Sequence, residues 1–238
     1  MKSGEPDAGG TGAGADRPRI TLPEWPVVFD QGICEVPLDF DAAWAKGWRH
    51  FGSRFFRYSL MMKDEAVLRV QCARLDLERF VMTKSQRRTW RNNDDTRLHI
   101  APPTPDDREE IIFLKHRDRF SDNVPEALTD FLGPEGTAAP CPCVQLSVYV
   151  GDALVAASFL GVGQTSCSSI YAIFDPAHER RRLGIYTALR EIELARRIGL
   201  RYYYLGYITV EPSCYDYKKQ FSGLEIFSWE GDWVAETT

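Results

Sequence analysis

The segment that most constrains the fold is a long amphipathic helix expected between residues 181 and 198. Its apolar residues recur at helical spacing on one face, and Gly199 stands where such a helix should stop. These residues are Ile185, Ala188, Leu189, Ile192 and Ala195. Strand-like runs flank the helix at 168–174 and 201–208, so this part of the 238-residue chain combines helix and sheet.

Further elements give the architecture of this half of the chain. Helices are predicted at 106–120 and 125–132, and a hairpin of two strands at 144–160. A short helix at 213–221 and a strand at 224–229 follow the long helix. The resulting order is two helices, three strands, a helix, a strand, a short helix and a strand. It matches the GNAT acyltransferase fold, a mixed sheet splayed at its centre with flanking helices.

Composition divides the chain into three parts. Residues 1–19 are rich in Gly, Ala, Asp and Pro and predict a disordered tail. Residues 20–100 are rich in aromatic side chains, with a short helix at 39–46 and an alternating strand at 67–77, and predict a small α+β domain. Residues 101–238 are expected to form the GNAT-like domain. The predicted fold class is therefore α+β.

The overall composition excludes several classes of protein. With 44% hydrophobic and 26% charged residues, the chain is neither globally disordered nor fibrous. No window approaches 18 apolar residues and no secretory signal is visible, so we expect a cytoplasmic protein without membrane contact. A net charge of −5 argues against indiscriminate adhesion to nucleic acid, although a local basic patch can still bind RNA.

Two segments are candidates for contact with an anion. The run DPAHERRRLGIY at 175–186 joins a strand end to a helix start, where exposed N–H groups, Arg181, Arg182 and the close approach allowed by Gly184 favour a phosphate. The run TKSQRRTWRNN at 83–93 carries four basic residues and no acid. Both patterns are also typical of a solvated helix face, so the residues alone leave the two interpretations open.

Four motifs in the second half of the chain resemble the arginyl- and leucyl-tRNA-protein transferases. They are F-D-P at 174–176, R-x-L-G-x-Y at 181–186, I-E-x-A at 192–195 and Y-x-Y-L-G-Y at 202–207. A Y-K-x-x-F follows at 217–221, and upstream SRFFRYSL at 53–60 and SQRRTWRNN at 85–93 resemble the N-terminal domain of the family. The similarity covers about residues 48–227.

The resemblance implies a transferase that moves Arg or Leu from charged tRNA to the α-amine of proteins with N-terminal Asp or Glu, marking them for degradation. No side-chain nucleophile is needed, because the amine has a pKa near 8 and the aminoacyl ester is already activated. Arg87, Arg88 and Lys218 are candidates for the cationic pocket that an acidic acceptor requires. Tyr186 and Tyr207 are candidates for bonding hydroxyls or stacking on the terminal adenosine.

Other matched positions carry weaker predictions. Asp175 is a candidate for orienting the incoming amine, although an Asp-Pro at a strand end is more often a helix cap. The remaining substrate-binding candidates are Ser85, Gln86, Arg181, Arg182, Gly184 and Phe221. Neither the donor amino acid nor the oligomeric state follows from the sequence.

The chain departs from the family in its cysteines. The family's N-terminal domain usually carries a C-x-x-C that binds an iron–sulfur cluster or zinc, whereas here 58–75 contains only Cys72. Six cysteines at irregular spacing, with no C-x-x-C, also predict no disulfide framework. We therefore expect no metal and no other cofactor.

Two alternatives remain open. One is an acyl-coenzyme A-dependent N-acyltransferase, because a fold does not dictate its donor. The other is a non-catalytic relative that binds tRNA or acidic N-termini, which the missing cysteines keep possible.

Overall fold

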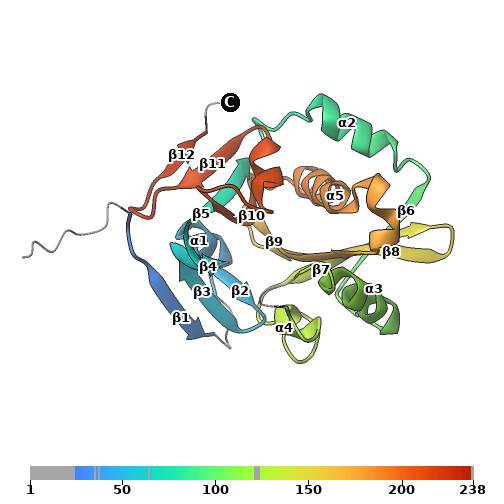
Figure 1. Cartoon of the computed structure of the whole chain (residues 1–238), viewed down its shortest axis with the longest axis horizontal. Coiled ribbons are helices and arrows are strands. Elements are labelled where there is room, and N and C mark those ends of the chain that lie inside the picture. The colour runs from blue at the N-terminus through green and yellow to red at the C-terminus, as the bar shows by residue number, and fades with distance from the viewer. Residues whose placement is uncertain (1–24, 35, 37, 64, 121–123, 237–238) are drawn as a thin grey trace, which may run out of the picture.

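One large mixed sheet organises the computed structural model, which describes residues 25–236 except 35, 37, 64 and 121–123. The strands of this sheet are β4 (Leu60–Lys63), β5 (Ala66–Asp76), β6 (Thr96–Ala101), β7 (Cys143–Val150), β8 (Ala153–Val162), β9 (Ser166–Phe174), β10 (Tyr202–Thr209), β11 (Leu224–Phe227) and β12 (Trp233–Ala235). They follow the order β12-β11-β5-β10-β9-β8-β7-β6, with β4 paired to β5 (Figure 1).

The pairing directions make this sheet mixed. Strands β6 to β9 form an antiparallel ladder, β9 and β10 run parallel, and β10, β5 and β11 are again antiparallel. The predicted α+β fold class, with a mixed central sheet and flanking helices, is confirmed. Strands β5 and β6 belong to the same sheet as β7–β11, so the sheet extends across the boundary expected between residues 100 and 101.

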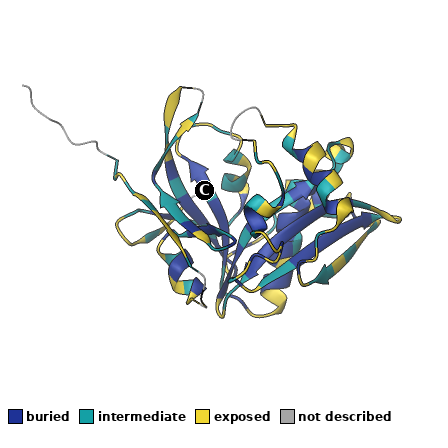
Figure 2. Ribbon diagram, turned by 90° about the horizontal axis from the view of Figure 1, so that it is seen from below, coloured by how far each residue is buried: buried dark blue, intermediate teal, exposed yellow. Residues whose placement is uncertain are grey.

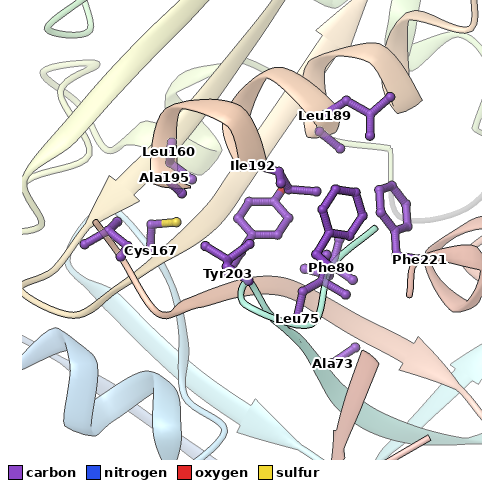
Figure 3. Packing of buried hydrophobic residues seen from close by; sticks show 14 of the residues in the cluster. Ala73, Leu75, Phe80, Leu160, Cys167, Leu189, Ile192, Ala195, Tyr203 and Phe221 are labelled. Atoms are coloured by element: carbon purple, nitrogen blue, oxygen red, sulfur yellow. The ribbon is translucent and has the colours of Figure 1, made fainter. Parts of the chain in front are cut away.

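The predicted long helix is present as α5 (Leu183–Arg197) and connects β9 to β10. Its apolar face packs on the sheet, with Leu189, Ile192 and Ala195 buried against strand residues such as Tyr203 (Figure 3). The helix starts two residues later than expected, because Arg182 adopts a left-handed φ of 54° that separates α5 from the 3-10 turn η1 (Pro176–Arg181).

Two further helices, α3 (Asp107–Arg117) and α4 (Thr129–Leu132), contribute to a core on the opposite face of the sheet. Alternation along β8 shows the two faces: Ala157 and Phe159 join the α3 and α4 cluster, whereas Ala156 and Leu160 join the clusters of α5. The central strands are therefore buried on both faces (Figure 2).

A second, three-stranded sheet lies beside the large one. It contains β1 (Phe29–Ile33), β2 (Arg49–Phe51) and β3 (Arg54–Tyr58) in the order β1-β3-β2, and α1 (Phe40–Ala45) precedes β2. The predicted helix at 39–46 is confirmed as α1, with Asp39 accepting a hydrogen bond at its N-terminus and Trp44 buried. The tail expected at 1–19 lies outside the described residues.

Several predicted boundaries were too wide. The helix expected at 125–132 spans only α4, and the short helix expected at 213–221 is the 3-10 turn η2 (Asp216–Gln220). Strand β6 was not predicted, whereas the basic run at 83–93 folds as helix α2 (Lys84–Arg91) behind a Thr83–Gln86 capping box. None of the helices in the described ranges is long and apolar enough to cross a membrane.

Candidate active site

The splay of the large sheet begins where β9 and β10 stop pairing. The two strands are paired at only three positions, from Tyr202↔Ser166 to Tyr204↔Ser168. Beyond them Gly206 adopts a left-handed φ of 89°, and the register of β10 on β5 shifts between Tyr204 and Gly206. A shift of this kind bends a strand, so β10 leaves β9 at this point and opens a gap between them.

A cavity of about 580 Å³ occupies this gap. Residues 169–172 and 174 of β9 and residues 205–209 of β10 form its two sides. Aromatic side chains from the small sheet, α4 and η2 close it, and Tyr58 packs on Tyr207 with 4.7 Å between ring centroids. The aromatic lining residues are Phe51, Phe56, Tyr58, Phe120, Phe131, Tyr171, Phe174, Tyr207, Tyr215 and Tyr217. A volume of this size suits a small organic group.

Two cationic side chains meet beside Gly206 in this cavity. A Cβ at Gly206 would lie 3.2 Å from Nη2 of Arg49 and 3.5 Å from Nζ of Lys218. Arg49, from β2, donates to Oγ of Ser168 and to the backbone oxygen of Ser169, and Lys218 donates to the backbone oxygen of Tyr207 at 2.9 Å. Neither cation forms an ion pair with any carboxylate in the described part of the chain.

The charge around this cation pair favours an anionic ligand. Burial and the positive charge of Arg49 lower the pKa of Lys218 to about 7. Burial also lowers the pKa of His116, which lines the cavity, to about 4, so its imidazole is neutral. The lining includes four cationic residues, Arg49, Arg119, Arg182 and Lys218, and one carboxylate, Glu179.

A basic surface begins at the rim of the cavity. Arg182 and Gly184, at the start of α5, both line the cavity, and Nη1 of Arg182 donates to Oγ of Ser85 on α2 at 2.7 Å. From Ser85 the exposed side of α2 carries four cations, which we call the α2 basic face: Lys84, Arg87, Arg88 and Arg91. Positively charged side chains therefore extend from Arg182 at the cavity rim to the exposed side of α2.

Comparison with known families identifies this arrangement. The profile of the family described as arginine-tRNA-protein transferase, C terminus, matches residues 104–228, which is more than half of the chain. This chain belongs to the arginine-tRNA-protein transferase family. It is therefore an aminoacyltransferase, with aminoacyl-tRNA and a protein as its substrates.

Similar transferases include two bacterial proteins. The aspartate/glutamate leucyltransferase of Thiobacillus denitrificans is 32% identical over 168 residues, which cover 68% of each chain. That of Acinetobacter baumannii is 29% identical over 196 residues, or 79% of this chain and 68% of the relative.

Among solved structures, FemX covers 82% of this chain and 70% of its own at 10% identity, with a TM-score of 0.49. A tandem GNAT protein from the clavulanic acid pathway covers 88% of this chain and 62% of its own at 12% identity, with a TM-score of 0.43.

The structure of this transferase brings some of the predicted site residues together. Arg182, Gly184, Tyr207 and Lys218 all line the cavity. The hydroxyl of Tyr207 donates to the backbone oxygens of Gly47 and Phe56 at 3.2 and 3.3 Å, and burial raises its pKa well above the usual value.

Other predicted residues lie outside the cavity lining. Asp175 caps η1 and pairs with Lys115 at 2.8 Å; burial opposes its ionisation, but these hydrogen bonds outweigh that effect and lower its pKa. Tyr186 is fully buried, and its hydroxyl bonds Thr96 at 2.7 Å and accepts from Arg190 at 2.9 Å. The roles predicted for Asp175 and Tyr186 stay predictions.

The remaining predicted residues lie on α2, at the end of η1 and just after η2, and none of them lines the cavity. Phe221 is buried in the core beside Phe80 (Figure 3), and Gln86 completes the capping box of α2. Arg181 pairs with Asp95 at 2.7 Å, and this hydrogen bond raises its pKa. Arg87 and Arg88 are exposed on the α2 basic face.

Arg49 is the main residue that sequence reasoning missed. It stands between Trp48 and His50 in a segment that matches no charged motif, and a single arginine carries no signal of burial. Its environment depends on the contact of β2 with β9, where Arg49 bonds Ser168, a residue 119 positions further along the chain. Cys72, the one cysteine in the segment where the family carries its C-x-x-C, is buried, and no group of three metal ligands occurs within the described ranges.

Proposed function

We propose that this transferase moves a leucyl group from tRNA to the α-amine of proteins that begin with Asp or Glu. The observation that carries the proposal is the cation pair Arg49 and Lys218, unpaired by acid within the described residues and placed in an aromatic cavity at the fork of β9 and β10. Each product would then be a protein marked for degradation by a new N-terminal leucine.

The acceptor follows from the cation pair. A buried cation without a counter-charge is costly, and a carboxylate that enters the cavity offsets this cost. An acceptor with N-terminal Asp or Glu carries such a carboxylate a few bonds from its reacting amine. We assign Lys218 as the residue that binds the acceptor carboxylate, because Lys218 lines the cavity and its ammonium group, with a pKa of about 7, can be protonated when the carboxylate binds.

The donor follows from the rest of the lining. Aromatic rings and aliphatic side chains such as Met61 and Ile170 surround the cavity, which suits a leucyl side chain. An arginyl side chain would add a guanidinium to four cations that face one carboxylate, Glu179. The names of the bacterial relatives also support leucine as the donor.

The tRNA is assigned to the surface that leads to the cavity. Arg182 lies at the rim and contacts Ser85, and from there the α2 basic face offers cations to the phosphates of the acceptor stem. In this arrangement the CCA end passes Gly184, where the backbone is accessible at the start of α5.

The reaction needs positioning rather than a covalent enzyme intermediate. The neutral α-amine attacks the ester carbonyl, a peptide bond forms, and the ester bond to the ribose breaks. The amine loses one proton and the departing ribose oxygen gains one, so the step balances without a cofactor. Tyr207 stays protonated because burial raises its pKa, and its donated bonds to Gly47 and Phe56 fix its ring in the cavity wall.

A transfer assay over a panel of substrates tests the proposal. The donors are leucyl-tRNA, arginyl-tRNA and acetyl-coenzyme A, and the acceptors are peptides that differ only in an N-terminal Asp, Glu or Ala. We expect transfer from leucyl-tRNA to the Asp and Glu peptides and little to the Ala peptide. Preference for arginyl-tRNA would contradict the donor assignment, equal use of all three peptides the acceptor assignment, and transfer from acetyl-coenzyme A alone the whole proposal.

A further inference from the structure

We propose that Arg49 is a positioning residue that holds β9 and β10 apart and so sets the width of the transfer cavity. Arg49 lies in β2, outside residues 104–228 that match the family profile. The proposal deepens the proposed function and rests on it for the meaning of the cavity.

The first observation concerns β9. The last residue of β9 that pairs with β10 is Ser168, and the guanidinium of Arg49 bonds there: Nη1 donates to Oγ of Ser168 and Nη2 to the backbone oxygen of Ser169. If the parallel ladder continued past Ser168, the backbone groups of β9 would pair with those of β10 at this point. Here the backbone oxygen of Ser169 accepts from Arg49 instead. Arg49 therefore occupies the fork itself.

The second observation concerns β10. The guanidinium that bonds β9 also lies against Gly206 of β10, where an added Cβ would be 3.2 Å from Nη2. Gly206 is in the left-handed region, with φ of 89°, which favours glycine. The guanidinium thus lies between the two strands at the bend of β10. Arg49 is hydrogen-bonded to β9 and packs against Gly206 of β10.

The chemistry of arginine suits this position. A planar guanidinium donates in two directions at once, whereas a lysine ammonium is a single compact charge. All the acceptors that Arg49 reaches are neutral oxygens, and it forms no ion pair with an acid of the described residues. Arg49 as a whole residue is 9% exposed, and removal of its side chain would leave the oxygens of Ser168 and Ser169 without this donor.

The proposal separates the role of Arg49 from that of Lys218. In Arg49→Lys the charge stays but the two-directional bond to β9 is lost, so the strands shift and the reacting groups are misplaced. We expect turnover to fall about tenfold or more with Asp and Ala acceptors alike. The preference for Asp over Ala should stay unchanged, because the carboxylate contact of Lys218 remains.

The experiment compares Arg49→Lys and Arg49→Ala with Arg74→Lys, a matched control. Arg74 is a partly buried arginine, which pairs with Glu225 at 2.8 Å and stacks 3.8 Å from the ring centroid of Tyr202, but it does not line the cavity. We measure kcat and KM for both acceptors, thermal unfolding, and hydrogen exchange of peptides covering 169–172 and 205–208. In Arg49→Ala, millimolar guanidinium should restore part of the turnover, and the same concentration of ammonium should not.

The outcomes are distinct. Faster exchange at the two fork segments in both Arg49 variants, with normal exchange in β7 and in the Arg74→Lys control, supports the proposal. Unchanged exchange and turnover in Arg49→Lys would overturn it, as would a loss of Asp preference without a loss of turnover. If the wild-type protein transferred no amino acid, the proposed function would fail, while the exchange data would still decide whether Arg49 spreads the strands. If Arg49→Ala does not fold, Arg49→Lys and its exchange carry the test.

Discussion

Two groups of cations in this transferase have the same sign of charge but opposite surroundings. Arg49 and Lys218 lie inside the cavity at the fork of the sheet, each hydrogen-bonded only to neutral oxygens. The α2 basic face instead exposes Lys84, Arg87, Arg88 and Arg91 on one helix surface. The first group is desolvated and hydrogen-bonded within the fold, and the second is exposed to solvent.

This difference teaches what each group can recognise. A desolvated cation interacts strongly with one nearby anion. It therefore discriminates between ligands that carry an anionic group at that position and ligands that lack one. Exposed cations exchange their counterions for phosphates and gain affinity without discrimination. Lys218 of the buried group therefore suits the acceptor side chain, and the α2 basic face suits the tRNA backbone.

The largest expected effect tests the buried group. Lys218→Met should reduce the preference for Asp over Ala acceptors by about 30-fold, because a hydrogen-bonded charge contact contributes about 2 kcal/mol. Thermal unfolding should not shift downward, since Met removes a buried unpaired charge. The control is Lys219→Met. Lys219 pairs with Asp216, and neither residue lines the cavity. An unchanged preference in Lys218→Met would remove Lys218 from the acceptor site.

The next effect tests the exposed group. Replacing both Arg87 and Arg88 by Ser should weaken binding of leucyl-tRNA about tenfold at moderate salt and reduce the slope of log affinity against log salt by about 1 for each lost phosphate contact. The Asp-over-Ala preference should stay unchanged. Filter binding at several salt concentrations measures the slope, and Arg54→Ser, on β3 away from α2, provides the control. A slope equal to that of the wild type would show that the α2 basic face does not contact RNA.

The same comparison shows how far the sequence predicts a structure of this kind. Local pattern was enough for α5 and for the hairpin of β7 and β8, because periodicity is a local property, and it located the basic run that folds as α2 without assigning it a helix. The partners of β5 were not predictable, since its pairing with β10 joins residues such as Val70 and Thr209 that are far apart in the chain. Arg49 was missed for the same reason. Its burial at the fork depends on contacts that no stretch of sequence encodes alone.

A pH profile sharpens the contrast, because only the buried group titrates near neutrality. Lys218 has a pKa of about 7, lowered mainly by burial, so its charged form declines as the pH rises through 7. The ratio of kcat/KM for Asp over Ala acceptors should therefore fall about fivefold between pH 7 and 8. The ionisation of the acceptor amine is common to both peptides and cancels in the ratio.

The control for the pH profile is Lys218→Arg, whose charge persists over this range. Its ratio of kcat/KM for the two acceptors should not change with pH. A wild-type ratio that stayed level from pH 6 to pH 9 would contradict the titration of Lys218 in the acceptor site.

The smallest expected effect on turnover concerns Tyr186, which is compared with Tyr207. Both tyrosines belong to the family motifs, but the structure places them in different surroundings. Tyr186 is fully buried and absent from the cavity lining, whereas Tyr207 lines it. In Tyr186→Phe the hydroxyl contacts with Thr96 and Arg190 are lost, which should cost about 1 kcal/mol of unfolding free energy and lower the melting temperature by about 2–4 °C. Turnover of the folded protein should stay within about twofold of the wild type, because Tyr186 contacts no cavity ligand in this arrangement. Steady-state transfer measured below the melting transition checks this, with Tyr207→Phe assayed in parallel. A tenfold loss of turnover in Tyr186→Phe with an unchanged melting temperature would return Tyr186 to the reaction centre and move that centre toward α2.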